Sequence, residues 1–207
     1  GESFRPVVPN VSGELFATDQ TPGSLTTNIT GTLEASVTPG FITFDGGSVL
    51  DLVEQPGPFL PGNTPADLAG TIEDVLPGLD GYATVRDAVF DVTNGPQSVS
   101  GLGEFSTAGM LVFFSSGMTT YEVPGVIDGS FTYGGQFDVF VPKTGLIEDL
   151  GGGVFKLTVP FEVSETFDTG IEGLTLTQSI TGQIVAVVPE PATLGMMIVG
   201  GIGLAVM

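Results

Sequence analysis

Residues 155–164, Phe-Lys-Leu-Thr-Val-Pro-Phe-Glu-Val-Ser, alternate between an apolar position and a polar or proline position. A period of two is typical of a β-strand with one face in a core and the other in water. Residues 29–38 show the same alternation. Pro160 cannot donate a hydrogen bond to a neighbouring strand, so it predicts an edge position or a bulge. The sequence therefore predicts an all-β fold.

Further strands are expected at 41–52, 83–93, 109–123, 126–141 and 174–186, with Gly- and Pro-rich turns between them. Met110 to Phe114 are apolar on both faces, which predicts a central strand. One short helix is expected to begin at Thr64-Pro65-Ala66-Asp67 and to end at Pro77. The whole predicts a single-domain β-sandwich or jelly roll over residues 1–188, beginning with an extended arm at 1–12.

The chain is strongly acidic, with 24 Asp and Glu against four Lys and Arg in 207 residues, a net charge of −20. Nucleic acid is excluded as a partner, because a phosphate backbone requires clustered basic residues. The acidity is expected mainly to keep the protein soluble. Carboxylates also bind Ca²⁺, and Asp45, Asp51 and Glu54 form a candidate cluster, although no stretch follows the spacing of a calcium loop.

The chain contains no Cys and no His. This removes His-dependent nucleophilic catalysis and the usual transition-metal ligands. Two carboxylates suffice for glycoside hydrolysis, but 24 acidic residues produce such pairs by chance. We therefore expect no enzymatic activity and no cofactor other than Ca²⁺. The 15 Phe residues are expected in the core. Tyr133, beside Gly134 and Gly135, is a candidate sugar contact on an exposed bulge.

Residues 189–207 form a second region, in which Pro189, Glu190 and Pro191 precede an uncharged, mostly apolar run from Ala192 to Met207. As a helix, sixteen residues would span about 24 Å, short of a hydrocarbon core of about 30 Å. As a strand, the run would complete the sheet of a neighbouring subunit. The third alternative is burial of the tail against its own body. The strand would place one bulky face toward its partner, namely Leu194, Met196, Ile198, Ile202, Leu204 and Val206.

A β-rich acidic body followed by Val188-Pro189-Glu190-Pro191 and an apolar tail resembles the PEP-CTERM family of exported bacterial surface proteins. In that family the tripeptide, a hydrophobic helix and a basic end form a sorting signal that an exosortase reads. The resemblance covers residues 188–207. The basic end is absent, because no Lys or Arg follows Lys156. The resemblance implies export to the cell surface or the extracellular space, with the signal peptide removed, and contact of the tail with the membrane or exosortase.

These observations favour a structural protein. We expect an extracellular matrix or filament subunit that self-associates into a homopolymer through its terminal segments. The alternative is a monomeric β-domain anchored at the cell surface that binds exopolysaccharide.

Overall fold

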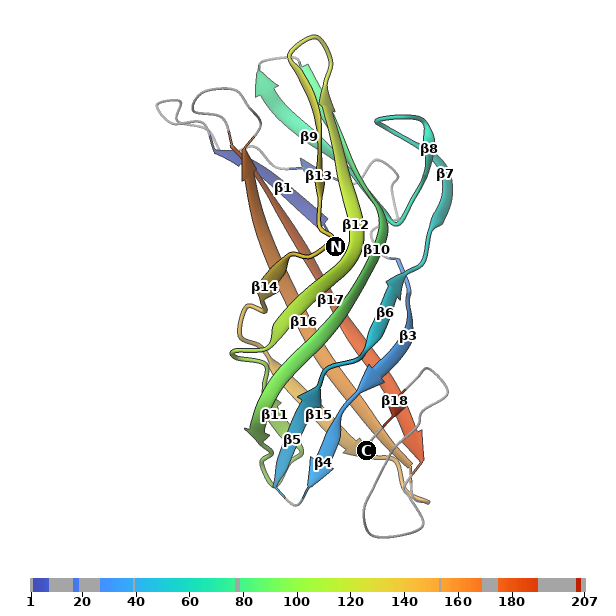
Figure 1. The fold of residues 1–207 in the computed structure, drawn as a ribbon, viewed down its shortest axis with the longest axis vertical. Coiled ribbons are helices and arrows are strands. Elements are labelled where there is room, and N and C mark those ends of the chain that lie inside the picture. The colour runs from blue at the N-terminus through green and yellow to red at the C-terminus, as the bar shows by residue number, and fades with distance from the viewer. Residues whose placement is uncertain are drawn as a thin grey trace.

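The computed structural model describes residues 2–7, 17–18, 27–38, 40–76, 79–152, 154–168, 175–189 and 204–205. Strands make up most of this part, and four long strands, β10, β12, β16 and β17, run along the length of the molecule (Figure 1). They belong to two large sheets, which contribute to one hydrophobic core. The predicted all-β, sandwich-like fold is confirmed.

The five-stranded sheet has the order β1 (Glu2–Val7), β17 (Thr175–Pro189), β16 (Val154–Asp168), β15 (Thr144–Asp149), β11 (Glu104–Ser106). The eleven-stranded sheet has a path of six strands: β13 (Ile127–Thr132), β12 (Leu111–Val123), β10 (Leu79–Ser98), β6 (Val49–Leu52), β3 (Ile29–Glu34), β18 (Leu204–Ala205). Five strands pair with members of this path or with each other: β2 (Ala17–Thr18), β4 (Ser36–Thr38), β5 (Phe41–Asp45), β9 (Leu68–Leu76), β14 (Phe137–Val139). A separate ribbon pairs β7 (Gln55–Phe59) with β8 (Thr64–Ala66).

The alternating segment at 155–164 lies in β16, which pairs antiparallel with the whole of β17, from Val154↔Pro189 to Asp168↔Thr175. Its apolar positions 157, 159, 161 and 163 are buried, as the period of two predicts. On the other side of β16 the ladder to β15 ends at Leu146↔Thr158. Pro160 lies two residues beyond that end, where its missing N–H costs no ladder hydrogen bond. The predicted edge position of Pro160 therefore holds only locally, because β16 itself is an interior strand between β17 and β15.

Aromatic side chains connect the two sheets. Phe161 on β16 lies 6.0 Å from Phe90 on β10, measured between ring centroids, and 5.5 Å from Phe140. Phe90 in turn lies 5.9 Å from Phe114 on β12. Such pairs add about 0.5–1.5 kcal/mol each beyond their burial. The expectation of Phe in the core is confirmed only in part, since Phe41 and Phe137 are exposed. Among the described side chains, seven Phe are buried: Phe44, Phe59, Phe90, Phe105, Phe114, Phe140, Phe161.

The predicted helix at 64–77 is wrong, since β8 and β9 occupy this stretch. β9 forms an antiparallel ladder with β10, in which Gly70 pairs with Ala83, and the N–H of Asp67 donates to the carbonyl of Val85. Residues 66–70 are all buried. A long-range ladder satisfies their backbone groups and therefore outweighs the local helix signals.

Two other predicted strands are interrupted. Residues 41–52 divide into β5 and β6, and residues 126–141 contain β13 and β14. The prediction of a central strand near Met110–Phe114 is confirmed, because Leu111 of β12 pairs with Thr93 of β10 on one side and with Val139 of β14 on the other. Among the described residues, the structure contains no helix with the length and hydropathy of a membrane span.

The predicted extended arm at 1–12 is in part a strand. Residues 2–7 form β1, which pairs antiparallel with β17 from Glu2↔Ile180 to Val7↔Thr175. Residues 8–12 lie outside the described residues. Strand β1 therefore covers only the first part of the outer edge of β17.

Candidate functional site

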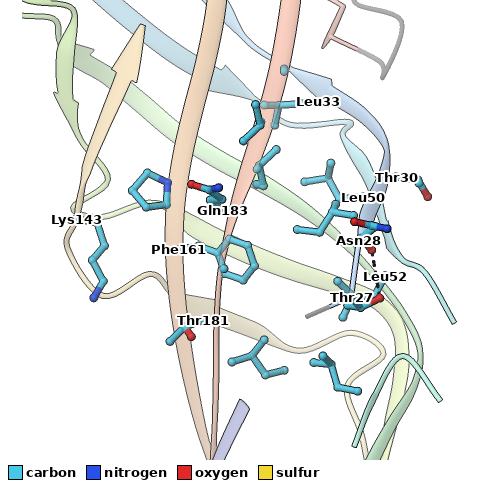
Figure 2. A pocket seen from close by; sticks show the side chains of 18 residues that line it. Thr27, Asn28, Thr30, Leu33, Leu50, Leu52, Lys143, Phe161, Thr181 and Gln183 are labelled. Carbon is cyan, nitrogen blue, oxygen red and sulfur yellow. Dashed lines mark hydrogen bonds between the residues drawn. The ribbon is translucent and has the colours of Figure 1, made fainter. Parts of the chain in front are cut away.

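A cleft of about 740 Å³ lies between the edges of the two sheets, with β3 and β6 on one wall and β16 and β17 on the other (Figure 2). Buried apolar side chains line its inner part. From the first wall they are Leu33, Leu50 and Leu52, and from the second Phe161, Ile180, Ile184 and Ala186. In Figure 2 the Phe161 ring points toward the leucines of the facing wall. The cleft therefore opens onto the hydrophobic core.

The second half of β17 forms a sheet edge along this cleft. Within the described part of the chain, residues 182–189 pair with β16 on one side and with no strand on the other. The lining includes side chains from both faces of this segment, the buried Ile184 and Ala186 and the exposed Gln183 and Val185. Its backbone edge is thus part of the cleft. An exposed strand edge of this kind is a template for pairing with another strand.

The lining carries almost no charge. None of its 18 residues is acidic, although the chain has 24 acidic residues. Among the described lining residues, Lys143 alone is charged, and its Nζ lies 2.7 Å from a carboxylate oxygen of Glu162. A lining whose one lysine is ion-paired, in a protein of net charge −20, is suited to an uncharged, apolar occupant rather than to a cation.

The C-terminal tail reaches this cleft. Leu204 and Ala205 form β18, which pairs parallel with Leu33 and Glu34 of β3 and lies close to β17. Leu33 is itself a lining residue. Leu204, a member of the bulky alternate set predicted from the sequence, therefore stands in register with a residue of the cleft wall.

The other predicted tail and sorting residues lie almost entirely beyond the described part. Pro189 is the last residue of β17, paired with Val154. Glu190, Pro191, Leu194, Met196, Ile198, Ile202 and Val206 lie outside the described residues. Sequence analysis selected the tail but missed the cleft. The signal for the first wall was present in the alternation of residues 29–38, whose apolar positions include Leu33.

The interpretation of Tyr133 as an exposed sugar contact is wrong. Its side chain is 1 % exposed, and its ring lies 5.1 Å from that of Phe114 and 5.3 Å from that of Phe131. Its hydroxyl group forms a hydrogen bond with the Thr119 hydroxyl group. A buried Tyr hydroxyl group needs such a hydrogen-bond partner. Because the Tyr133 ring is buried, a sugar cannot stack on it.

The structure does not bring Asp45, Asp51 and Glu54 together as a metal site. Among the described residues there is no group of three or more acidic side chains arranged to hold an ion. Asp45 instead accepts a hydrogen bond from the Ser36 hydroxyl group. Asp51 and Glu54 lie near another carboxylate, that of Asp67.

Asp67 is the buried acid that sequence analysis did not identify. Its side chain is 3 % exposed and accepts a hydrogen bond of 2.8 Å from the backbone N–H of Ala88. Burial raises the pKa of Asp67 to about 6, the Ala88 N–H opposes that rise, and the nearby charges of Asp87, Asp51 and Glu54 add to it. The next residue, Leu68, lines the cleft.

A second exposed feature lies on β12 and β14. Phe137 is 66 % exposed, and its ring centroid lies 4.6 Å from that of Phe113, its partner across the strands. The neighbouring pair, Leu111 and Val139, is also exposed. These four residues form an apolar patch on the outer face of the larger sheet.

Comparisons of the chain with protein-family models, curated proteins and solved structures found no match.

Proposed function

We propose that this protein is an exported structural subunit that self-associates into an extracellular filament or matrix through its terminal segments. The observation that carries the proposal is the nearly uncharged cleft beside residues 182–189 of β17, which the chain's own apolar tail reaches at β18. A strand edge next to an apolar cleft supports strand addition, in which backbone hydrogen bonds supply affinity and alternate side chains enter the partner's core. The contact is head to tail, so it generates an open polymer unless the rotation closes.

Export belongs to the same proposal. The resemblance of residues 188–207 to a PEP-CTERM sorting signal supports delivery to the cell surface, with exosortase and membrane contacting the tail during export. Catalysis forms no part of the proposed role, and neither does nucleic acid.

Electron microscopy of the full chain beside a chain ending at Val188 tests this proposal. Fibres from the full chain that disappear in the truncated chain support it. A full-length control, Ile202→Asp with Leu204→Asp, keeps the length of the tail but removes its apolar character and is expected to abolish fibres as well. Monodisperse particles from the unchanged full chain would overturn the filament.

Charge adds a condition to the assembly. Each copy carries −20, so copies repel one another, and salt screens that repulsion over a Debye length of about 10 Å at 0.1 M. Fibre yield, measured by sedimentation, is expected to rise from low salt to about 0.15 M NaCl. Ca²⁺ at matched ionic strength separates screening from calcium binding, because only calcium binding predicts a larger yield than Na⁺ gives.

A second candidate function is that of a monomeric, surface-anchored β-domain that binds exopolysaccharide. The exposed Phe137, whose ring lies against the half-buried Phe113, favours it, since sugars stack on exposed aromatic rings. Affinity electrophoresis in a gel containing polysaccharide tests this candidate. Retardation of the protein that Phe137→Ala abolishes would support it, with Phe41→Ala as the control at another exposed Phe.

A further inference from the structure

We propose that the cleft between β3 and β17 is the acceptor site for the C-terminal tail of a second copy of this chain, exchanged from copy to copy. This inference rests on the proposed function and names the two surfaces that make its contact. The donor is the sixteen-residue segment Ala192 to Met207, and the acceptor is the wall formed by β3 together with residues 182–189 of β17.

The tail already has contacts suited to this site. In a single chain β18 pairs with Leu33 and Glu34, the last two residues of β3, and lies close to β17. Among the described residues, that contact involves Leu204 and Ala205 of the tail, and the cleft beside β3 has a volume of about 740 Å³. Exchanging an identical element between copies reproduces the contacts of the single chain, which makes it a low-cost route to association.

The donor segment is long enough to pair along the whole acceptor edge. Residues 182–189 form an edge of eight residues, and a strand rises about 3.3 Å per residue, so the edge is about 26 Å long. Sixteen tail residues are enough to pair along that edge and leave a connection of several residues. Both donor and lining are nearly free of charge, so a tail strand enters without burying an unpaired carboxylate.

The sequence between β17 and the donor segment favours delivery to another copy. A tight hairpin back along β17 would need Gly or Asn in its turn. The residues that follow Val188 are Pro189, Glu190, Pro191, Ala192 and Thr193, without either type. Proline fixes its own φ and biases the preceding residue toward an extended conformation. This sequence therefore disfavours a tight hairpin onto the adjacent edge of β17, and within the described residues the chain's own tail pairs with β3 rather than with that edge.

Cysteine cross-linking tests the proposal, because the natural chain has no Cys. A ¹⁵N-labelled Glu34→Cys chain is mixed with an unlabelled Ala205→Cys chain, at the positions that are in register in β18 and β3. A flexible bis-maleimide is then added under fibre-forming conditions. A cross-link that joins labelled to unlabelled peptide reports contact between copies only. Thr30→Cys, also on β3 and lining the cleft, is a second acceptor variant in case Glu34→Cys does not fold.

The control acceptor is Ser130→Cys on β13, an exposed position on a strand that does not border the cleft. The expected result is a mixed cross-link with Glu34→Cys or Thr30→Cys at least about tenfold more abundant than with Ser130→Cys. Peptide mass spectrometry of the mixture measures the ratio.

Each other outcome has a definite meaning. Cross-links confined to one chain, seen when Glu34→Cys and Ala205→Cys are combined in the same molecule, would overturn exchange in favour of a tail that closes its own cleft. Fibres without a cleft cross-link would overturn the acceptor site and leave the proposed function standing. The absence of both fibres and cross-links would overturn both.

Discussion

The two parts of β17 differ on one edge, although both pair with β16 along the same continuous ladder. Residues 175–180 also pair with β1, so that part of the strand lies inside the sheet. Residues 182–189 border the cleft, and no strand of the described part pairs with them there. Natural sheets usually protect such an edge with lysines, bulges or a covering segment. An apolar cleft beside an edge that no described strand covers supports the binding surface proposed above.

The largest expected effect on stability is at Phe161 of β16, which lies opposite the second part of β17. Phe161 pairs with Gly182, is 6 % exposed and contacts Phe90 and Phe140. Phe161→Ala is expected to lower the free energy of unfolding by about 3–5 kcal/mol through lost packing and the resulting cavity. Urea denaturation measures the change. The exposed Phe137→Ala should cost no more than about 1.5 kcal/mol, the upper value for an aromatic pair. Equal costs would contradict the assignment of Phe161 to the core.

The β3 wall of the cleft requires a glycine at position 31. Gly31 in β3 has φ of +127°, and an added Cβ would lie 1.8 Å from the carbonyl oxygen of Val49. Gly31→Ala is expected to lower the free energy of unfolding by about 2–6 kcal/mol, the sum of backbone strain and overpacking, as measured by thermal or urea denaturation. Gly40→Ala is the matched control, because φ there is +82° but no atom lies within 4 Å of the added Cβ. It should cost only the strain, about 1–3 kcal/mol. A similar cost at both positions would show that β3 has room where the structure places the Val49 carbonyl.

An intermediate effect is expected at Asp67, which precedes the cleft residue Leu68. Its folded pKa of about 6 exceeds the ordinary value of 3.8, so its contribution to stability is fully present below about pH 3.8 and is lost as the pH rises through 6. Asp67→Asn keeps an acceptor for the Ala88 N–H and removes the buried charge. It should stabilise the protein by about 1–3 kcal/mol at pH 8 and by little at pH 3.5. Melting curves at the two pH values measure this difference. A variant less stable than the natural chain at pH 8 would contradict it.

The smallest effect on stability is expected at Gln183, on the edge of β17 that borders the cleft. The same position is expected to have a large effect on assembly. Gln183 is exposed and lines the cleft. Gln183→Glu should change the free energy of unfolding by less than about 0.5 kcal/mol. A bound strand would desolvate the new carboxylate, so the critical concentration for fibres should rise at least about tenfold, which corresponds to 1.4 kcal/mol. Thr132→Glu on β13 adds the same charge away from the cleft. If both variants assemble alike, net charge rather than the cleft governs assembly.

Sequence periodicity predicted the strands but could not predict the cleft. The alternation at 29–38 and 155–164 identifies two strands with one buried face each. Which strand edges remain exposed depends on strand order, and strand order follows from long-range pairings such as β1 with β17 that no local pattern encodes. The helix expected at 64–77 failed for the same reason, because pairing of β9 with β10 outweighs local helix signals.

Individual site residues show a similar division. The tail was recognisable because composition alone distinguishes residues 192–207 from the acidic body. Tyr133 was misassigned because the adjacent Gly134 and Gly135 suggested an exposed bulge, whereas its ring packs against Phe114 and Phe131. Asp67 was not distinguishable from the other acidic residues by sequence, since its burial arises from packing between β8, β9 and β10.

Hydrogen exchange along β17 of the full-length protein tests the central claim most directly. Peptides covering residues 175–180 and 182–188 are compared before and after assembly, by mass spectrometry. Before assembly, residues 182–188 should exchange faster, because no strand of the described part pairs with their outer edge. After assembly their exchange should slow to the rate of residues 175–180, as a donor strand takes the position that β1 holds on the first part of the strand. Unchanged exchange at 182–188 in the assembled protein would contradict the account.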